Sequence, residues 1–136
     1  MDYLISEGEK LGYMPTEFGA DGSITESKIV AGADVIKGQI LVMSDAMTVV
    51  PSSAASNQVI GVAMFDAANT KPVSVECRGL VRLTASGAIT VPTRLKSAAD
   101  GKVAAWVSGT DAADLIVGIA LSDATDGKQT IARLTL

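Results

Sequence analysis

The sequence predicts an all-β protein: a small antiparallel β-barrel or sandwich with an internal pseudo-repeat and an extended N-terminal arm. Three observations support this class. Short apolar segments are separated by turn signals at intervals of about 8–12 residues, no segment keeps a helical period over three turns, and one strand-like phrase occurs twice. The chain has 136 residues, which is enough for one domain with a substantial hydrophobic core.

The repeated phrase is the strongest internal signal. Residues Val59–Ala67 read VIGVAMFDA, and residues Ile116–Ala124 read IVGIALSDA. Each copy is an apolar strand with a glycine in its middle, closed by Asp-Ala and a polar turn. The copies lie roughly 55 residues apart, a spacing typical of structural repeats, but two copies are too few for a solenoid. We therefore expect one pseudo-symmetric β-domain over residues 24–136.

Residues 1–23 are predicted to form an extended arm. Glycines and a proline interrupt this segment too often for a stable helix or strand, yet it holds three of the five aromatic residues of the chain. Aromatic side chains on an acidic, glycine-bearing segment are typical of a segment that orders on another protein surface. The alternative is that the arm folds back over its own β-domain. The candidate contact residues are Tyr3, Leu4, Ile5, Tyr13 and Phe18.

From Ile24 onward the pattern is that of strands joined by tight turns. Residues 58–64 are apolar on both sides, as in the middle of a packed sheet, and residues 73–78 alternate with period two. Gly79 indicates a bulge or bend. Hairpin turns are predicted at Ser86-Gly87, Asp100-Gly101, Ser108-Gly109 and Asp126-Gly127. The predicted strands are 24–30, 39–43, 47–50, 58–64, 73–78, 80–83, 88–91, 94–96, 103–107, 115–121 and 129–136.

The composition favours a protein with a partner. Charged residues make up 19% of the chain, below the typical value of about 25%, while apolar residues make up 48% and the mean hydropathy is +0.35. Such a chain is expected to bury surface against its own copies or another protein, although an alanine-rich β-domain would also raise these values. No run reaches the length of about 18 apolar residues that a membrane span needs, and we expect no signal peptide.

Charge is distributed unevenly along the chain. The first 28 residues hold six acidic and two basic side chains, a net charge of −4, whereas the nine acidic and nine basic residues that follow cancel. Because nucleic-acid binders carry a basic footprint, we expect neither a nucleic acid nor a membrane as partner. Cys77 is the single cysteine, so no internal disulfide is expected. Its alternation with Val73 and Val75 predicts an unreactive thiol on the apolar face.

No pattern predicts catalysis, a cofactor or a metal ion. The chain has no histidine, which removes a common general base and the most common metal ligand. Asp111 and Asp114 are the nearest approach to a carboxylate site, and an exposed turn explains them better than a metal. The turn at Met43–Met47 is similar to the attachment turn of biotinyl and lipoyl carrier domains, but it has no lysine to modify. We expect no catalytic, cofactor-binding or metal-binding residue and no small-molecule substrate.

Three residues are candidates for a subunit interface. Trp106 lies on the strand face opposite Val103 and Ala105, where it would contact a subunit; a tryptophan packed within the protein is the alternative. Arg78 and Arg82 flank Gly79 on the polar side of their strand and would pair with acids of a neighbour, although exposed ion pairs contribute little stability.

Several of these segments together resemble the capsid cement, or head decoration, proteins of tailed bacteriophages. The resemblance covers residues 29–136, and this chain's arm is longer than the family leads one to expect. It implies a small β-barrel-like protein without enzymatic activity that binds the outside of the mature capsid, commonly as a trimer, and clamps neighbouring capsid subunits. The segments that carry it are Gly61-Val62-Ala63, Gly118-Ile119-Ala120, Gly79-Leu80-Val81 and Ala132-Arg133-Leu134.

The resulting hypothesis is a structural protein of the virion, a cement protein that binds the major capsid protein on the outer capsid surface. It would stabilise the mature shell by bridging capsid subunits, form a homotrimer and be synthesised in the cytoplasm of the bacterial host. The arm residues would contact the capsid or a neighbouring subunit. Two alternatives stay open. One is a β-module of the phage tail or baseplate, and the other, of a different class, is a small-ligand-binding or enzymatic β-barrel.

Overall fold

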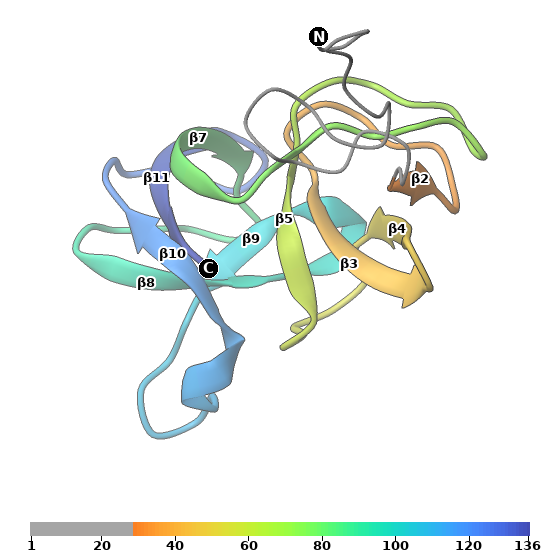
Figure 1. Ribbon diagram of the computed structural model, residues 1–136. Coiled ribbons are helices and arrows are strands. Elements are labelled where there is room, and N and C mark those ends of the chain that lie inside the picture. The colour runs from red at the N-terminus through yellow and green to blue at the C-terminus, as the bar shows by residue number, and fades with distance from the viewer. Residues whose placement is uncertain (1–28) are drawn as a thin grey trace, which may run out of the picture.

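The fold is built almost entirely from short strands. A computed structural model describes residues 29–136, so the predicted arm and most of the strand predicted at 24–30 lie outside the described residues. Within that range the chain forms two five-stranded sheets (Figure 1), which confirms the all-β class. The same range contains two 3-10 helices, η1 (Ala99–Gly101) and η2 (Ala113–Leu115). Neither has the length or the apolar character of a membrane-spanning helix.

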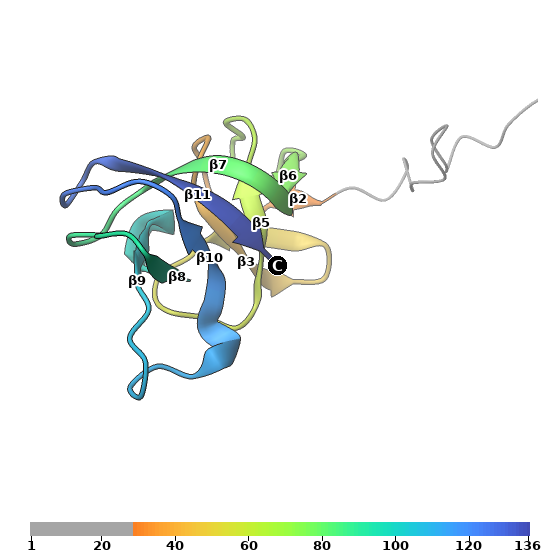
Figure 2. The same cartoon turned by 90° about the vertical axis from the view of Figure 1, so that its left-hand side faces the viewer.

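The two sheets follow one another along the chain. All of their strand pairs are antiparallel except the β2–β4 pair, which is parallel. The first sheet has the spatial order β2 (Val30–Ala31), β4 (Thr48–Pro51), β3 (Ile40–Asp45), β5 (Val59–Ala63) and β6 (Val75–Glu76). The second sheet has the order β7 (Arg78–Thr84), β11 (Gln129–Thr135), β10 (Ile116–Ala120), β8 (Thr93–Ser97) and β9 (Val103–Ala105). Figure 2 shows β7 and β11 running side by side along the curled second sheet.

The first sheet closes on itself. Val30 forms an antiparallel bridge with Pro72, and the backbone N–H of Val73 donates to the carbonyl oxygen of Ile29 at 2.9 Å. These contacts join β2 to the segment that leads into β6, so the two ends of the sheet meet. The first residue that the structure describes, Ile29, therefore lies beside Val73.

The internal pseudo-repeat is confirmed by the strand order. The first sheet contains the series β4-β3-β5-β6, and the second contains the matching series β9-β8-β10-β11. The two copies of the repeated phrase are β5 and β10, and their central glycines play the same role. A Cβ atom at Gly61 would lie 2.5 Å from the carbonyl oxygen of Glu76, and one at Gly118 would lie 2.5 Å from that of Arg133. Each glycine thus allows the next strand to approach closely.

The aspartates that close the two phrases are also equivalent. The side chain of Asp66 accepts a hydrogen bond from the backbone N–H of Lys37, and that of Asp123 accepts one from Val91, both at 2.8 Å. Asp66 therefore fixes the loop that precedes β3, and Asp123 fixes the loop that precedes β8. The four predicted turn glycines all have positive φ, between 70° and 85°, as tight turns require.

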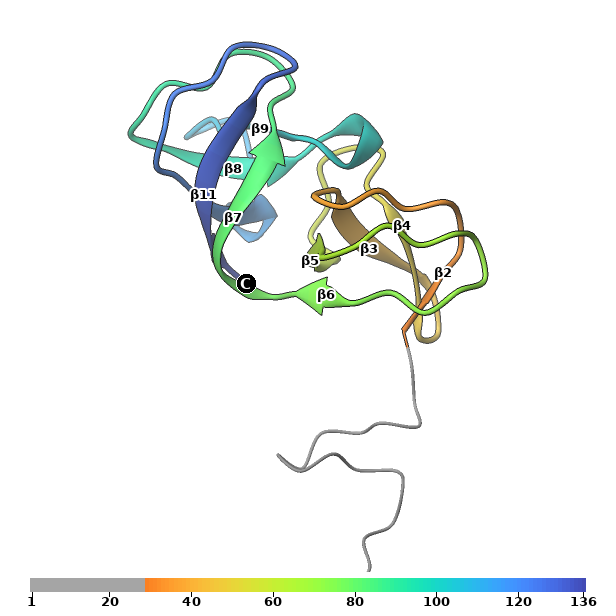
Figure 3. The same ribbon diagram turned by 90° about the horizontal axis from the view of Figure 1, so that it is seen from above.

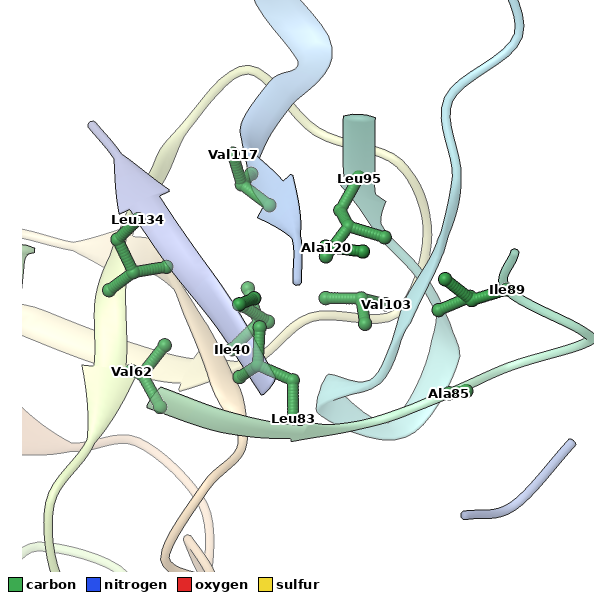
Figure 4. Close-up of a cluster of buried hydrophobic side chains, with 11 residues drawn as sticks. Ile40, Val62, Leu83, Ala85, Ile89, Leu95, Val103, Val117, Ala120 and Leu134 are labelled. Atoms are coloured by element: carbon green, nitrogen blue, oxygen red, sulfur yellow. The ribbon is translucent and has the colours of Figure 1, made fainter. Parts of the chain in front are cut away.

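Strands β3 and β5 form a wall between two hydrophobic clusters. Ile40 and Val62 belong to the larger cluster, which fills the curled second sheet (Figure 4). Their neighbours Leu41 and Ala63 point to the other side, into the smaller cluster inside the first sheet. Because side chains alternate along a strand, these two strands must be apolar on both faces. This confirms the predicted strand with apolar side chains on both faces for Val59–Ala63, whereas Gln58 and Met64 at the predicted ends lie outside the strand and are exposed.

Cys77 corrects one prediction. The alternation of residues 73–78 placed this thiol on the apolar face, but it is exposed. The reason is a break in the strand: β6 ends at Glu76 and β7 begins at Arg78, so the alternation does not continue through Cys77. The break falls two residues before Gly79, where the sequence indicated a bend, and the register of β7 with β11 continues through Gly79 without a shift.

Candidate functional site

The candidate site is the outer face of the second sheet. The core takes one set of alternating side chains from these strands, such as Leu83, Leu95 and Leu134, each at most 4% exposed. Residues on either side of these positions must therefore point outward. The outward set includes every arginine of the chain, and all of them are exposed: Arg78, Arg82, Arg94 and Arg133.

One line of outward residues crosses the whole sheet. Ile119 lies opposite both Arg94 and Arg133, and Arg133 lies opposite Leu80 on the outermost strand. At the other end Trp106, which directly follows β9, donates its backbone N–H to the carbonyl oxygen of Arg94 at 2.8 Å. The line therefore alternates bulky apolar and cationic side chains over all five strands. We call the following set the arginine face: Arg78, Leu80, Arg82, Arg94, Trp106 and Arg133.

The arginine face carries an unbalanced positive charge. The five strands of this sheet contain four arginines and Lys96 but no acidic residue. Between residues 29 and 136, no ion pair joins an arginine to an acid; the ion pair of this range is Lys96 with Asp111, at 2.8 Å. Apolar side chains are exposed beside these cations, Leu80 at 67% and Leu121 at 50%. A face with this combination is typical of a protein-binding surface, where arginine and aromatic residues are enriched.

A groove of about 610 Å³ adjoins the arginine face at the edge strand β7. Leu80 and Arg82 belong to both, and the opposite side of the groove is formed by Met64 and Phe65 at the end of β5. Figure 3 shows how β6 leads into β7 on one side, with β5 on the other. Met64 and Phe65 are 41% and 62% exposed. The groove is therefore an apolar trough, with cationic and acidic side chains at its rim: Lys37, Arg82 and Glu76.

The loop between β9 and β10 is fixed to the sheet by two side chains. Asp111 accepts hydrogen bonds from the Lys96 ammonium and from the backbone N–H of Val107, both at 2.8 Å. The hydrogen bond from Lys96, and to a smaller extent the one from Val107, holds the pKa of the Asp111 carboxyl below its ordinary value of 3.8. The indole N–H of Trp106 donates to the carbonyl oxygen of Ala112 at 2.8 Å. Asp111 thus has a structural role in this loop.

Asp111 and Asp114, which the sequence offered as the nearest approach to a carboxylate site, have different partners in the structure. Asp114 accepts a hydrogen bond from the side-chain amide of Asn57 at 3.1 Å, so Asp111 and Asp114 have separate partners. Across residues 29–136, no group of three or more potential ligands is arranged to hold a metal ion.

Comparison with known proteins identifies the family. The sequence profile of phage cement proteins matches residues 20–135. The chain belongs to this family. It is a capsid-associated structural protein of a bacteriophage, and the matched region covers both sheets.

The fold is shared with another protein of phage heads. The chain is similar to the N base of the head fibre gp8.5 of bacteriophage phi29, with a TM-score of 0.59 and 20% sequence identity over 79% of this chain and 91% of that chain. At this level of identity the similarity shows a common fold. No curated protein matches the sequence.

The structure brings the predicted interface residues of this cement-family chain together. Arg78, Arg82 and Trp106 all lie on the arginine face, and Arg82 also lines the groove. Their role in a subunit interface stays a prediction. The predicted arm contacts, Tyr3, Leu4, Ile5, Tyr13 and Phe18, lie outside the described residues.

Sequence reasoning missed several residues of the site. The pattern Arg78-x-Leu80-x-Arg82 contains the signal for Leu80, because residues two apart share a strand face. Arg94 and Arg133 could not be found in this way, since only the strand order places them beside β7. The groove residues Met64 and Phe65 follow the first repeated glycine strand, but the sequence does not show that β7 lies opposite them.

Proposed function

We propose that the protein binds the outer surface of the capsid, contacts the major capsid protein and stabilises the mature shell by bridging neighbouring capsid subunits. The observation that carries this proposal is the match to the phage cement family over residues 20–135. The likeness to the N base of a head fibre agrees with a place on the phage head. The protein is made in the cytoplasm of the bacterial host, and its role on the shell is structural rather than enzymatic.

The proposed mechanism is multivalent attachment. A homotrimer presents three copies of each contact surface, so modest contacts combine into a high avidity when the surfaces engage several capsid subunits together. Binding that occurs only to the assembled shell stabilises that shell by mass action. Tyr3, Leu4, Ile5, Tyr13 and Phe18 of the arm supply contacts to the capsid or to a neighbouring subunit, and the arginine face supplies a second contact surface.

The first experiment is to count this chain in purified particles relative to the major capsid protein, by quantitative gel or mass spectrometry. A ratio near one to one supports a cement protein that covers the shell. A few copies per particle would instead indicate a component of the tail or baseplate. Absence from the particle would contradict the proposal.

A second experiment tests the role of the arm. Deletion of residues 1–23 should weaken binding to purified capsids, because it removes all five proposed arm contacts, while far-UV circular dichroism should still show a β-domain. A full-length variant with serine at those five positions should lose binding in the same way, which separates side-chain contacts from arm length. The double variant K102Q/K128Q, which lies outside both the arm and the arginine face, is the control. Full affinity in both arm variants would overturn the proposed arm contacts.

A further inference from the structure

We propose that, in the free subunit, the groove and the adjoining arginine face bind the acidic arm of the same chain, residues 1–23. This inference goes beyond the proposed function and does not depend on it, because it concerns the subunit before it meets a capsid. Without an occupant, this surface would expose cations and apolar side chains together.

Charge complementarity is the first argument. The arm carries a net charge of −4, and the rest of the chain is neutral. Within that neutral remainder the cations are concentrated on one surface: Arg78, Arg82 and Arg133 lie together at the β7 and β11 end of the arginine face, and Lys37 lies across the groove. Among residues 29–136 the three arginines have no acidic partner. Glu76 is the one acidic residue among those that line the groove, and the arm supplies the further acids that would balance these cations.

Apolar complementarity is the second argument. Met64, Phe65 and Leu80 line the groove and are 41%, 62% and 67% exposed. The volume of about 610 Å³ falls in the range of pockets that hold small organic ligands, about 300–1,000 Å³, so it has room for aromatic side chains. The arm contributes three aromatic residues, Tyr3, Tyr13 and Phe18. A segment that is both acidic and aromatic fits a trough that is both apolar and rimmed by cations.

The root of the arm is the third argument. The bridge of Val30 with Pro72 is antiparallel, and Ile29 pairs with Val73. A chain that continued this direction toward the N-terminus would run beside β6 and reach Arg78. Arg78 lies five positions after Val73, a distance of about 16 Å at roughly 3.3 Å per residue. The 28 residues that precede Ile29 span up to about 90 Å when extended, so the arm reaches the whole surface.

The free edge of β7 offers a backbone docking site as well. β7 is the outermost strand of the second sheet, and over Arg78–Thr84 its sheet partner is β11. Its other side is bridged to β9 only beyond its C-terminal end, where Ala85 pairs with Val103. Such an edge can accept an added strand through main-chain hydrogen bonds. Because the arm is tethered close to this edge, its effective concentration there is on the order of millimolar. This favours the arm of the same chain over that of a second copy.

The native cysteine provides the test. Cys77 is exposed between β6 and β7, on the expected path of the arm, and it is the only cysteine of the full-length chain. A nitroxide attached to Cys77 should broaden the amide resonances of the arm in the NMR spectrum of the ¹⁵N-labelled protein, relative to the same sample after reduction of the nitroxide. Absence of broadening in the arm would overturn the proposal.

A mixed sample identifies which chain supplies the arm. It contains ¹⁵N-labelled protein without nitroxide and unlabelled protein with nitroxide at Cys77, so it reports only contacts between copies. We expect the arm resonances in this sample to stay sharp. Broadening as strong as in the singly labelled protein would show that a second copy supplies the arm, and would overturn the assignment to the same chain.

Matched charge variants test the role of the arginines. R82Q/R133Q should remove most of the broadening, whereas K102Q/K128Q, with the same change in net charge but no place on the arginine face, should leave it unchanged. Salt near 1 M, which reduces the screening length to about 3 Å, should also weaken the effect. Equal broadening in the two variants would contradict the charge argument. The dispersed resonances of the β-domain serve as a check that each variant is folded.

Discussion

Replacing the two repeated glycines by alanine should have unequal effects, although the sequence around them is nearly the same. A Cβ at Gly118 would lie 2.5 Å from the carbonyl oxygen of Arg133, whereas an ordinary contact requires about 3.4 Å. Strand β11 would have to move by about 0.9 Å, and its bonds to β10 would then exceed about 3.5 Å. Because β11 is paired with β7 on its other side, it has no free direction in which to move.

Loss of one or two of these hydrogen bonds, at about 1 kcal/mol each, adds to an overpacking cost of about 1–3 kcal/mol. G118A should therefore lower the free energy of unfolding by about 2–5 kcal/mol, or the Tm by roughly 10–20 °C. G61A meets the carbonyl oxygen of Glu76 at the same 2.5 Å and also meets the Cγ1 atom of Val75 at 2.5 Å. In addition, Gly61 has φ +157°, a backbone conformation that residues with a side chain rarely adopt, whereas Gly118 has no such φ. G61A should therefore cost more than G118A.

Urea and thermal unfolding of the two variants measure this difference. G127N is a suitable control, since Gly127 lies in an open turn with φ +80°, a conformation that asparagine tolerates. A G118A protein within about 0.5 kcal/mol of the wild type would refute the reasoning, as would a smaller cost for G61A than for G118A.

Three further predictions concern single side chains. L83A, at a fully buried position, should lower the free energy of unfolding by about 2–5 kcal/mol, whereas L80A, on the same strand but 67% exposed, should change it by less than about 0.5 kcal/mol. D111N should be less stable than the wild type above the ordinary aspartate pKa of 3.8, and thermal unfolding at several pH values should show the gap closing as the pH falls below it through the lower folded pKa. W106F keeps the ring but loses the indole hydrogen bond to the loop backbone, so amide exchange in residues 107–115 should become faster and stability should fall by about 1 kcal/mol.

Local patterns in the sequence were sufficient to predict the fold class. Apolar runs at 58–64 and 115–121 became β5 and β10, and the duplicated phrase became the matching halves of the two sheets. The turn dipeptides were also reliable, because positive φ is a local steric requirement. These features depend on neighbouring residues only, which the sequence displays directly.

The site depended on long-range pairing and was only partly predictable. Arg94 and Arg133 lie far from Arg78 in sequence, and they share a face with it because β10 and β11 insert between β7 and β8. Cys77 was placed wrongly because alternation was extended across a strand break that falls two residues before Gly79, where the sequence indicated the bend. Strand order and strand ends are set by the packing of the whole domain, so period-two patterns alone do not determine them.

The pseudo-repeat explains why the arginine face exists on one sheet only. Ile40 pairs with Val62 in the first half as Arg94 pairs with Ile119 in the second. These are equivalent positions on equivalent strands. Ile40 and Val62 are buried, at 0% and 3% exposed, whereas Arg94 is exposed.

The difference follows from the order of the two halves. In the first half this strand face is covered by the second half of the chain, so it is apolar and forms part of the shared core. In the second half, no third copy of the repeated unit covers the equivalent face within residues 29–136. This face carries arginines in place of the apolar side chains of the first half. A duplicated fold thus leaves one face of its last sheet uncovered within residues 29–136, and this is the surface that we propose binds the acidic arm.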